Sequence, residues 1–186
     1  MNQRSSGLRR GYRDPLTDEQ LKDVRMGQRV EFDATARHYG KPKFLTIGDG
    51  SRIDGYTIFV LTGPMTIGRG VHISSHCKFN SEAGITIGDR VQISSHVRAF
   101  SASTDFKELE VIEGVPFVKQ HKAPIYIDSD VTIGSGVVIV PGIRIHEGAA
   151  VGANAVVTQS IPAWEIWAGV PAVKIGERKK TERSVK

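Results

Sequence analysis

The sequence predicts an all-β solenoid of stacked three-sided coils, and three observations support this. A six-residue unit recurs, with Ile, Val or Phe at its first position and a small or apolar residue at its fifth. Glycine is frequent, with 20 residues, whereas aromatic residues make up only 7%, as expected for many tight turns around small side chains. The motif Ile-Ser-Ser-His occurs at 73–76 and again at 93–96, twenty residues later.

The repeat fits neither a helix nor a flat strand. A helix places apolar residues at i, i+3, i+4 and i+7, and a flat strand alternates them every two residues. Apolar first and fifth positions in a six-residue period instead indicate a short strand followed by a turn. Three such units would close a triangular coil, and coils would stack about 4.8 Å apart. The units begin at Ile67, Ile73, Phe79, Ile87, Ile93, Ile127, Ile133, Ile139, Ile145 and Val151.

The spacing also predicts which residues of neighbouring coils lie next to each other. Ile47, Ile67 and Ile87 are twenty residues apart, so equivalent positions should stack, and His76 should lie against His96. The pattern stops after residue 99 and resumes at Ile127. Residues 100–124 are therefore predicted to form a long loop that leaves the solenoid at a corner, and such loops are often functional.

These limits divide the chain into three parts. Residues 1–44 are expected to form an N-terminal arm with a short capped helix at 14–21. Residues 45–162 are expected to form the solenoid with its loop at 100–124. Residues 163–186 are expected to form a C-terminal turn and a basic tail, with a short helix or strand at 173–181.

Composition excludes several classes of protein. The net charge of +5 comes from basic residues near the two ends, and no basic face with interleaved aromatic residues indicates a nucleic-acid partner. No segment has the roughly 18 apolar residues of a membrane span, and the N-terminus lacks the apolar core of a secretory signal. The single cysteine, Cys77, excludes an internal disulfide and a cysteine-cluster metal site, and its place in the repeat predicts a core residue. A cytoplasmic protein is expected.

Several motifs in register resemble those of the hexapeptide-repeat acyltransferases, near the galactoside and maltose O-acetyltransferases and the acetyltransferases of surface-polysaccharide sugars. They are Ile133-Gly134-Ser135-Gly136-Val137-Val138-Ile139-Val140-Pro141-Gly142, Glu147-Gly148-Ala149-Ala150-Val151-Gly152-Ala153 and Ala168-Gly169-Val170-Pro171-Ala172. The resemblance covers about residues 45–178. It implies a left-handed parallel β-helix, a homotrimer with active sites between subunits, and acetyl-coenzyme A as acyl donor.

The activity implied is direct transfer of an acetyl group to a hydroxyl or amino group of a sugar, either free or nucleotide-linked. This reaction needs a base for the acceptor proton, a donor to polarise the thioester, and contact between the substrates. It requires no metal. The sequence does not separate O-acetylation from N-acetylation.

The candidate base differs from that of the relatives. They usually carry a histidine in the loop, in a Thr-Ala-Thr-His-Pro context, whereas this chain has Asp105 at that place in Ser101-Ala102-Ser103-Thr104-Asp105-Phe106. We therefore expect His76 as base, then His72, oriented by Asp105 or Glu82. The alternative is that each histidine is an exposed residue of a polar turn. Acceptor contacts are expected from Asn80, Glu82 and His121, whereas nothing singles out His96 or His146.

The donor site is expected at the C-terminal coils. Ser135, Gly152 and Ala153 would let the pantetheine arm approach the backbone. Lys174 and Arg178 would meet phosphates, although in relatives a lysine directly follows the Pro-Ala pair. The alternatives are turn geometry for the small residues and packing for Trp164 and Trp167. The full set is Ser135, Gly152, Ala153, Thr158, Trp167, Gly169, Val170, Pro171, Lys174 and Arg178.

Two other functions compete with this one. The first is a non-catalytic solenoid used as a scaffold. The second is a zinc-dependent carbonic anhydrase on the same fold, which needs three histidines at a subunit interface, two of them five residues apart. His72 and His76 are four residues apart. Coenzyme A binding and metal analysis would separate these alternatives.

Overall fold

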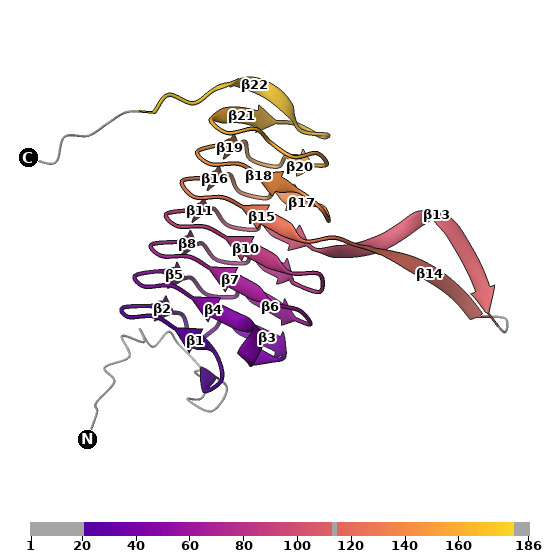
Figure 1. Cartoon of the computed structure of the whole chain (residues 1–186), viewed down its shortest axis with the longest axis horizontal. Helices are drawn as coiled ribbons and strands as arrows, with labels where there is room; N and C mark the ends of the chain where they lie inside the picture. The colour runs from indigo at the N-terminus through magenta and orange to yellow at the C-terminus, as the bar shows by residue number, and fades with distance from the viewer. Residues whose placement is uncertain (1–20, 113–114, 181–186) are drawn as a thin grey trace, which may run out of the picture.

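The computed structural model describes residues 21–112 and 115–180, and the side chains within them except at 106–118. Successive coils stack along one axis, and a long two-stranded hairpin projects from the side of the stack (Figure 1). The helix predicted at 14–21 lies, apart from Leu21, outside the described residues. None of the helices in the described ranges is long and apolar enough to cross a membrane.

Each coil contributes one strand to each of three parallel faces. Face A contains β1 (Arg25–Met26), β4 (Leu45–Ile47), β7 (Met65–Ile67), β10 (Ile85–Ile87), β15 (Ile125–Ile127) and β18 (Arg144–Ile145). Face B contains β2 (Glu31–Phe32), β5 (Arg52–Ile53), β8 (His72–Ile73), β11 (Gln92–Ile93), β16 (Thr132–Ile133), β19 (Ala150–Val151), β21 (Glu165–Ala168) and β22 (Val173–Glu177). Face C contains β3 (Arg37–Gly40), β6 (Ile58–Leu61), β9 (Lys78–Asn80), β12 (Arg98–Phe100), β17 (Val138–Ile139) and β20 (Val156–Val157). A short 3-10 helix, η1 (Pro42–Phe44), joins the first two coils.

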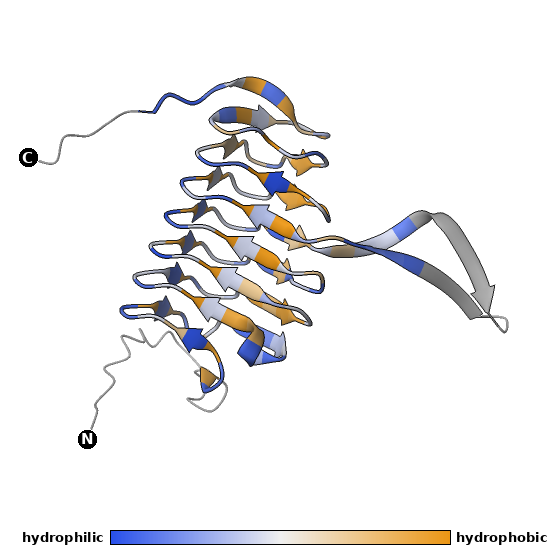
Figure 2. Cartoon of the chain, viewed as in Figure 1, coloured by the Kyte–Doolittle hydropathy of each residue, from blue (hydrophilic) through white to orange (hydrophobic). Residues whose placement is uncertain are grey.

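The predicted register is confirmed. Ile47, Ile67 and Ile87 pair across β4, β7 and β10, and each is buried. Apolar residues recur at the same place in successive coils and form one continuous core (Figure 2). Because each coil covers the apolar row of the next, the stack buries what a single coil would expose. Cys77 is part of this core, as predicted.

The corners between faces turn through residues with positive φ. We name the corners AB, BC and CA after the faces they join. Corner AB has Arg29, Gly50, Gly70, Arg90, Asp130, Gly148 and Trp164 in this conformation, and corner BC has Tyr56, His76, His96, Gly136, Asn154 and Gly169. A left-handed backbone is unusual for residues other than glycine, so the stacked hydrogen bonds of the coils must hold it in place.

The segment predicted as a loop is instead an antiparallel hairpin of β13 (Ala102–Ile112) and β14 (Val115–Lys122). Sequence reasoning missed it because the six-residue template detects only strands that belong to a coil. The solenoid closes beneath the hairpin, because Ala123 N donates to Ser101 O and Ile125 N donates to Gly84 O. Ile85 and Ile125 then pair as if the hairpin were absent.

The paired strands extend beyond residues 45–162 at both ends. The first coil begins at β1, and in its next strand, β2, Phe32 takes the buried position held by isoleucine in later coils. At the other end, β21 adds a parallel strand, and β22 pairs with it in the antiparallel direction. The tail region predicted as a helix or strand is therefore a strand at Val173–Glu177.

Candidate active site

Corner BC carries a ladder of three exposed rings. The ring of His76 stacks between those of Tyr56 and His96, with both pairs of centroids 5.0 Å apart. The stacking of His76 on His96 confirms the register predicted from the repeated Ile-Ser-Ser-His motif. Both histidines lie at a turn with their side chains exposed, so the position of His76 also fits the exposed-corner alternative.

Small residues continue the same corner above the ladder. Gly136 N donates to Ser95 O at 2.9 Å, and Asn154 N donates to Ser135 O at 2.8 Å, so these coils stack without large side chains between them. A Cβ atom at Gly134 would lie 2.6 Å from Ala153 N. The structure brings together here the predicted donor residues Ser135, Gly152, Ala153, Gly169, Val170 and Pro171. This edge offers backbone groups that a long flexible ligand can approach closely.

The remaining predicted donor residues lie elsewhere. Trp167 is 9% exposed and belongs to the core, as expected if its role is packing. Its indole N–H donates to Glu165 Oε2 at 2.7 Å. Lys174 Nζ donates to Glu165 at 2.8 Å and to Glu177 at 3.0 Å. The hydrogen bond to Glu165 raises the pKa of Lys174. Thr158 is exposed just after β20, on the way to corner CA.

Arg178 also makes contacts within the chain. Its Nη1 donates to the carbonyl oxygens of Asp130 at 2.9 Å and Gly148 at 3.2 Å. Both acceptors are residues of corner AB, so Arg178 fastens the C-terminal segment to the corner opposite the predicted donor edge. In this structure both cations expected to meet phosphates, Lys174 and Arg178, are engaged by protein groups.

The predicted acceptor residues gather at corner CA, at the root of the hairpin. Asn80 Oδ1 accepts a hydrogen bond from Glu82 N at 3.3 Å, and Glu82 forms an ion pair with Lys122 at the end of β14. His121 pairs with Ser103 across the hairpin, and Asp105 lies two residues beyond Ser103. Residues from a coil and from both hairpin strands therefore meet at this corner.

One chain does not bring the predicted base and its carboxylate together. His76 lies at corner BC, whereas Glu82 and Asp105 lie at and beyond corner CA, at the other end of strand β9. Six extended residues, the separation of His76 from Glu82, span about 20 Å. A hydrogen bond between these side chains is excluded in this arrangement.

His72 instead has a carboxylate partner that sequence reasoning missed. Its Nε2 lies 2.9 Å from Asp54 Oδ2, and Arg52 Nε donates to Asp54 Oδ1 at 2.7 Å. Partial burial raises the pKa of Asp54, but the hydrogen bonds from His72 and Arg52 outweigh it and leave the pKa below its ordinary value. The twenty-residue register was the available signal, because it sets residues 52 and 54 beside residues 72 and 74.

His146 and Cys77 are both held by contacts within the fold. His146 Nδ1 lies 3.5 Å from Asp128, which also accepts from Arg144. Burial raises the pKa of the Cys77 thiol to about 11, which keeps it protonated at neutral pH. Within residues 21–112 and 115–180, no group of three or more His, Cys, Asp or Glu side chains is placed to hold a metal ion.

Comparison with known proteins decides the family. Residues 124–159 match the family described as the hexapeptide repeat of succinyl-transferase. The structure superimposes on the N-acyltransferase AntD from Bacillus cereus with a TM-score of 0.80 and 30% identity, over 90% of this chain and 92% of AntD. The chain belongs to the hexapeptide-repeat acyltransferases. Its fold is the left-handed parallel β-helix that the resemblance implied.

The AntD structures contain informative ligands and substitutions. One holds dTDP-4-amino-4,6-dideoxyglucose and coenzyme A, and another holds dTDP and 3-hydroxybutyryl-CoA with 31% identity to this chain. Several are variants of one AntD serine or of one AntD aspartate that lies ten positions further along. A maltose O-acetyltransferase from Clostridium difficile, at 20% identity and a TM-score of 0.54, shares the fold alone.

A shorter match connects the chain to curated proteins. It is 41% identical over 64 residues to 2,3,4,5-tetrahydropyridine-2,6-dicarboxylate N-acetyltransferase from Staphylococcus aureus. The match covers 34% of this chain, and the chain spans only 27% of the length of that relative.

Proposed function

We propose that this protein is a coenzyme A-dependent acyltransferase that acylates the amino group of a nucleotide-linked sugar. The overall similarity to AntD supports both substrates, since AntD is an N-acyltransferase whose structures hold coenzyme A derivatives and a dTDP-amino sugar. The Staphylococcus aureus relative also transfers an acetyl group to nitrogen. This choice narrows the hydroxyl-or-amine alternative left open by the sequence.

The main support for the proposal is the spacing between a serine and an aspartate. The altered serine and aspartate of AntD are ten positions apart, and Ser95 followed by Asp105 is the only serine in the present sequence with an aspartate ten positions later. Asp105 is also the residue found where related O-acetyltransferases carry histidine. Ser95 lies at corner BC beside the ring ladder, with its Oγ 3.5 Å from Ser75 Oγ.

The chemistry of an amine explains an aspartate at this place. A sugar ammonium must lose a proton before its nitrogen attacks the thioester carbonyl, and the Asp105 carboxylate is suited to accept that proton. The C–N bond then forms and the C–S bond breaks, while the second proton of the attacking nitrogen passes to the leaving thiolate, so that the products are an amide and a free thiol. The Ser95 hydroxyl is suited to donate a hydrogen bond to the developing oxyanion. A hydroxyl acceptor, which is far less acidic than an ammonium ion, would favour histidine.

This assignment requires more than one copy of the chain. Ser95 precedes β12 at corner BC, whereas Asp105 follows β12 on the hairpin strand β13 beyond corner CA, so one site that uses both must take them from neighbouring subunits. We propose the homotrimer implied by the family, with the acyl donor along corner BC of one subunit and the acceptor at the hairpin of the next. A cytoplasmic location fits these metabolites.

The direct test measures acyl transfer from acetyl-coenzyme A to dTDP-4-amino-4,6-dideoxyglucose. We expect Asp105→Asn and Ser95→Ala to lower kcat by about 10²- to 10⁴-fold while coenzyme A binding is retained. His76→Ala and His72→Ala are the matched controls and should stay near wild type. Loss of activity only in a histidine variant would show that this histidine, and not Asp105, is the general base. A wild-type protein that binds no coenzyme A would favour the scaffold or zinc alternatives.

Mixing the two inactive variants tests the shared site. When Ser95→Ala and Asp105→Asn subunits are unfolded and refolded together, about one quarter of the sites should combine an intact serine with an intact aspartate. Activity should therefore return to about that fraction of wild type. If each site lies within one subunit, the mixture stays inactive, and light scattering reports whether trimers form at all.

A further inference from the structure

Face C combines exposed cations with strands that carry no acid. Its strands β3, β6, β9, β12, β17 and β20 contain no aspartate or glutamate; the strands of face A contain none either, but the face A cation Arg144 is paired with Asp128. Lys78 and Arg98 point outward from β9 and β12 and are exposed. The middle of face C is therefore positively charged with no compensating acid on its own strands.

The two cations are also direct neighbours. Arg98 pairs with Lys78 in the parallel register, which places their backbones about 4.8 Å apart. Like charges opposite each other on paired strands are destabilising. In the described part of the chain neither residue has an ion-pair partner. The fold thus keeps an arrangement that an anion would relieve.

Four other arginines of the coils behave differently. Arg52, Arg69, Arg90 and Arg144 each form an ion pair with an aspartate. Lys174 and Arg178, the residues expected from the sequence to meet phosphates, are engaged by carboxylates and carbonyl oxygens. Lys78 and Arg98 are thus the cations of this solenoid face left available for a ligand.

We propose that Lys78 and Arg98 bind the diphosphate of the nucleotide-linked acceptor. This inference rests on the proposed function and assigns the acceptor's anionic group to face C. The pair lies between the ring ladder at corner BC and the hairpin root at corner CA, where Asp105 is expected to act. Two adjacent cations match two linked phosphates, and charge-assisted hydrogen bonds to phosphate are among the stronger polar contacts.

Coenzyme A also contains a diphosphate, but its expected position is different. The small residues predicted to contact the donor belong to the coils of β16, β17 and β19 and the turn after β21. Lys78 and Arg98 lie on earlier coils, on the N-terminal side of Ser135. The position therefore favours the acceptor nucleotide, and the two sources can be separated by experiment.

The test measures the Kd of dTDP, dTMP and coenzyme A by calorimetry for wild type, Lys78→Ala and Arg98→Ala. Arg144→Ala, which removes an exposed and paired cation on face A, is the control. Each face C variant should weaken dTDP binding about tenfold or more and reduce the preference for dTDP over dTMP. The salt dependence of dTDP binding should fall as well. The affinity for coenzyme A, and every affinity of Arg144→Ala, should stay unchanged.

Other results would overturn the assignment. Weaker coenzyme A binding with unchanged dTDP binding would show that Lys78 and Arg98 bind the acyl donor. Unchanged binding of both ligands, with loss of the oligomer in light scattering, would make the pair a subunit contact. In either case wild-type amine acylation would show that the proposed function stands, whereas a wild type that neither binds coenzyme A nor acylates the amine would remove that function itself. Absence of dTDP binding by wild type would also reject the inference.

Discussion

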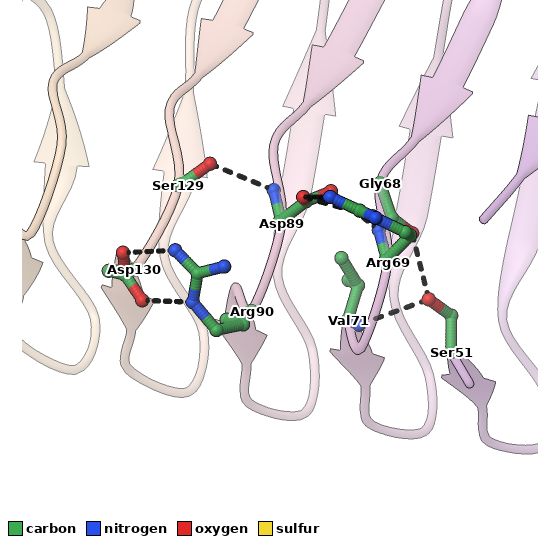
Figure 3. Close-up of polar contacts among 8 residues, drawn as sticks. All are labelled: Ser51, Gly68, Arg69, Val71, Asp89, Arg90, Ser129 and Asp130. Atoms are coloured by element: carbon green, nitrogen blue, oxygen red, sulfur yellow. Dashed lines mark hydrogen bonds and ion pairs between the residues drawn. The ribbon is translucent and has the colours of Figure 1, made fainter. Parts of the chain in front are cut away.

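Corners AB and BC turn the same chain through the same left-handed backbone, but they use their polar groups differently. At corner AB, Arg69 donates to Asp89 and Arg90 donates to Asp130 through two nitrogens each (Figure 3). The Ser51 hydroxyl joins neighbouring coils there, donating to Gly68 O at 2.8 Å and accepting from Val71 N at 3.0 Å. Corner BC has a similar bridge, since the Thr57 hydroxyl donates to Ser74 O at 3.2 Å, but its outer edge presents stacked aromatic rings and small residues.

The difference teaches how a uniform repeat acquires a site. At corner AB the backbone N–H of Arg69, followed by its side chain, lowers the pKa of Asp89, so this carboxylate stays ionised and fixed. Polar groups that satisfy one another strengthen the stack and leave little for a ligand. Where a coil keeps aromatic faces, backbone groups or unpaired cations exposed, the same geometry becomes a binding surface.

Matched glycine substitutions should give the largest effect. A Cβ at Gly68 of corner AB and one at Gly134 of corner BC would each lie 2.6 Å from a backbone atom of the next coil. Gly68→Ala and Gly134→Ala should therefore each cost about 1–3 kcal/mol of unfolding free energy, measured with urea. At a temperature where both variants are folded, only Gly134→Ala should weaken coenzyme A binding.

Gly50→Ala is the control for this pair. No atom lies within 4 Å of a Cβ at Gly50, so only its φ of +66° opposes alanine, and about 1 kcal/mol is expected. Equal loss of coenzyme A affinity in the Gly68 and Gly134 variants would show that the corners do not differ as argued.

The Cys77 thiol, which lies inside corner BC, should be inaccessible to reagents although the outer edge of this corner is exposed. Because burial raises the pKa of Cys77 to about 11, native protein at pH 8 should react with iodoacetamide at least about 100-fold more slowly than unfolded protein. The unfolded thiol ionises near its ordinary value, so the stability of the fold should decline as pH rises from about 9 towards 11. Cys77→Val, which copies Val97 of the next coil, should remove this decline. Rapid labelling of native protein would mean that the ligand edge extends inside the coil.

Removing single charges should give the smallest changes in Tm, and these changes should differ in direction between corner AB and face C. Arg90→Ala breaks an exposed ion pair at corner AB and should lower Tm slightly, with the difference disappearing in 1 M NaCl, a concentration that screens such pairs. Arg98→Ala relieves repulsion from Lys78 on face C and should leave Tm unchanged or raise it. Thermal scans at low and high salt measure both changes. A drop in Tm for Arg98→Ala would reveal an internal partner for this cation.

Much of the fold follows from spacing because each stacked position is fixed by the residue twenty places away. The isoleucine columns, the buried Cys77 and the His76–His96 stack were all predicted this way. Phe32 and its coil were missed because different apolar residues fill the same space there. The hairpin was missed because its strands pair with each other and follow a different period.

The site was harder to predict because side-chain pairing is not periodic. Spacing placed the small residues predicted to contact the donor at one edge, where the structure also has them, but it gave no sign that Lys174 would meet Glu165 or that Arg178 would reach Gly148. The register sets Arg52 beside His72, with Asp54 two residues further along, and this signal for the His72–Asp54 contact was not used. In the proposed trimer, the roles of Asp105 and His76 would depend on residues of a second subunit, which no pattern within one chain can indicate.

The closure beneath the hairpin has a consequence for how such proteins diversify. Since Ser101 O and Gly84 O bond directly to the returning strand, the coils are hydrogen-bonded as though residues 102–122 were an attached part. The hairpin can therefore change length or sequence while the stack keeps its register. A scaffold that holds one acyl donor can thus acquire new acceptors by exchanging a single projecting segment, in evolution or in the laboratory.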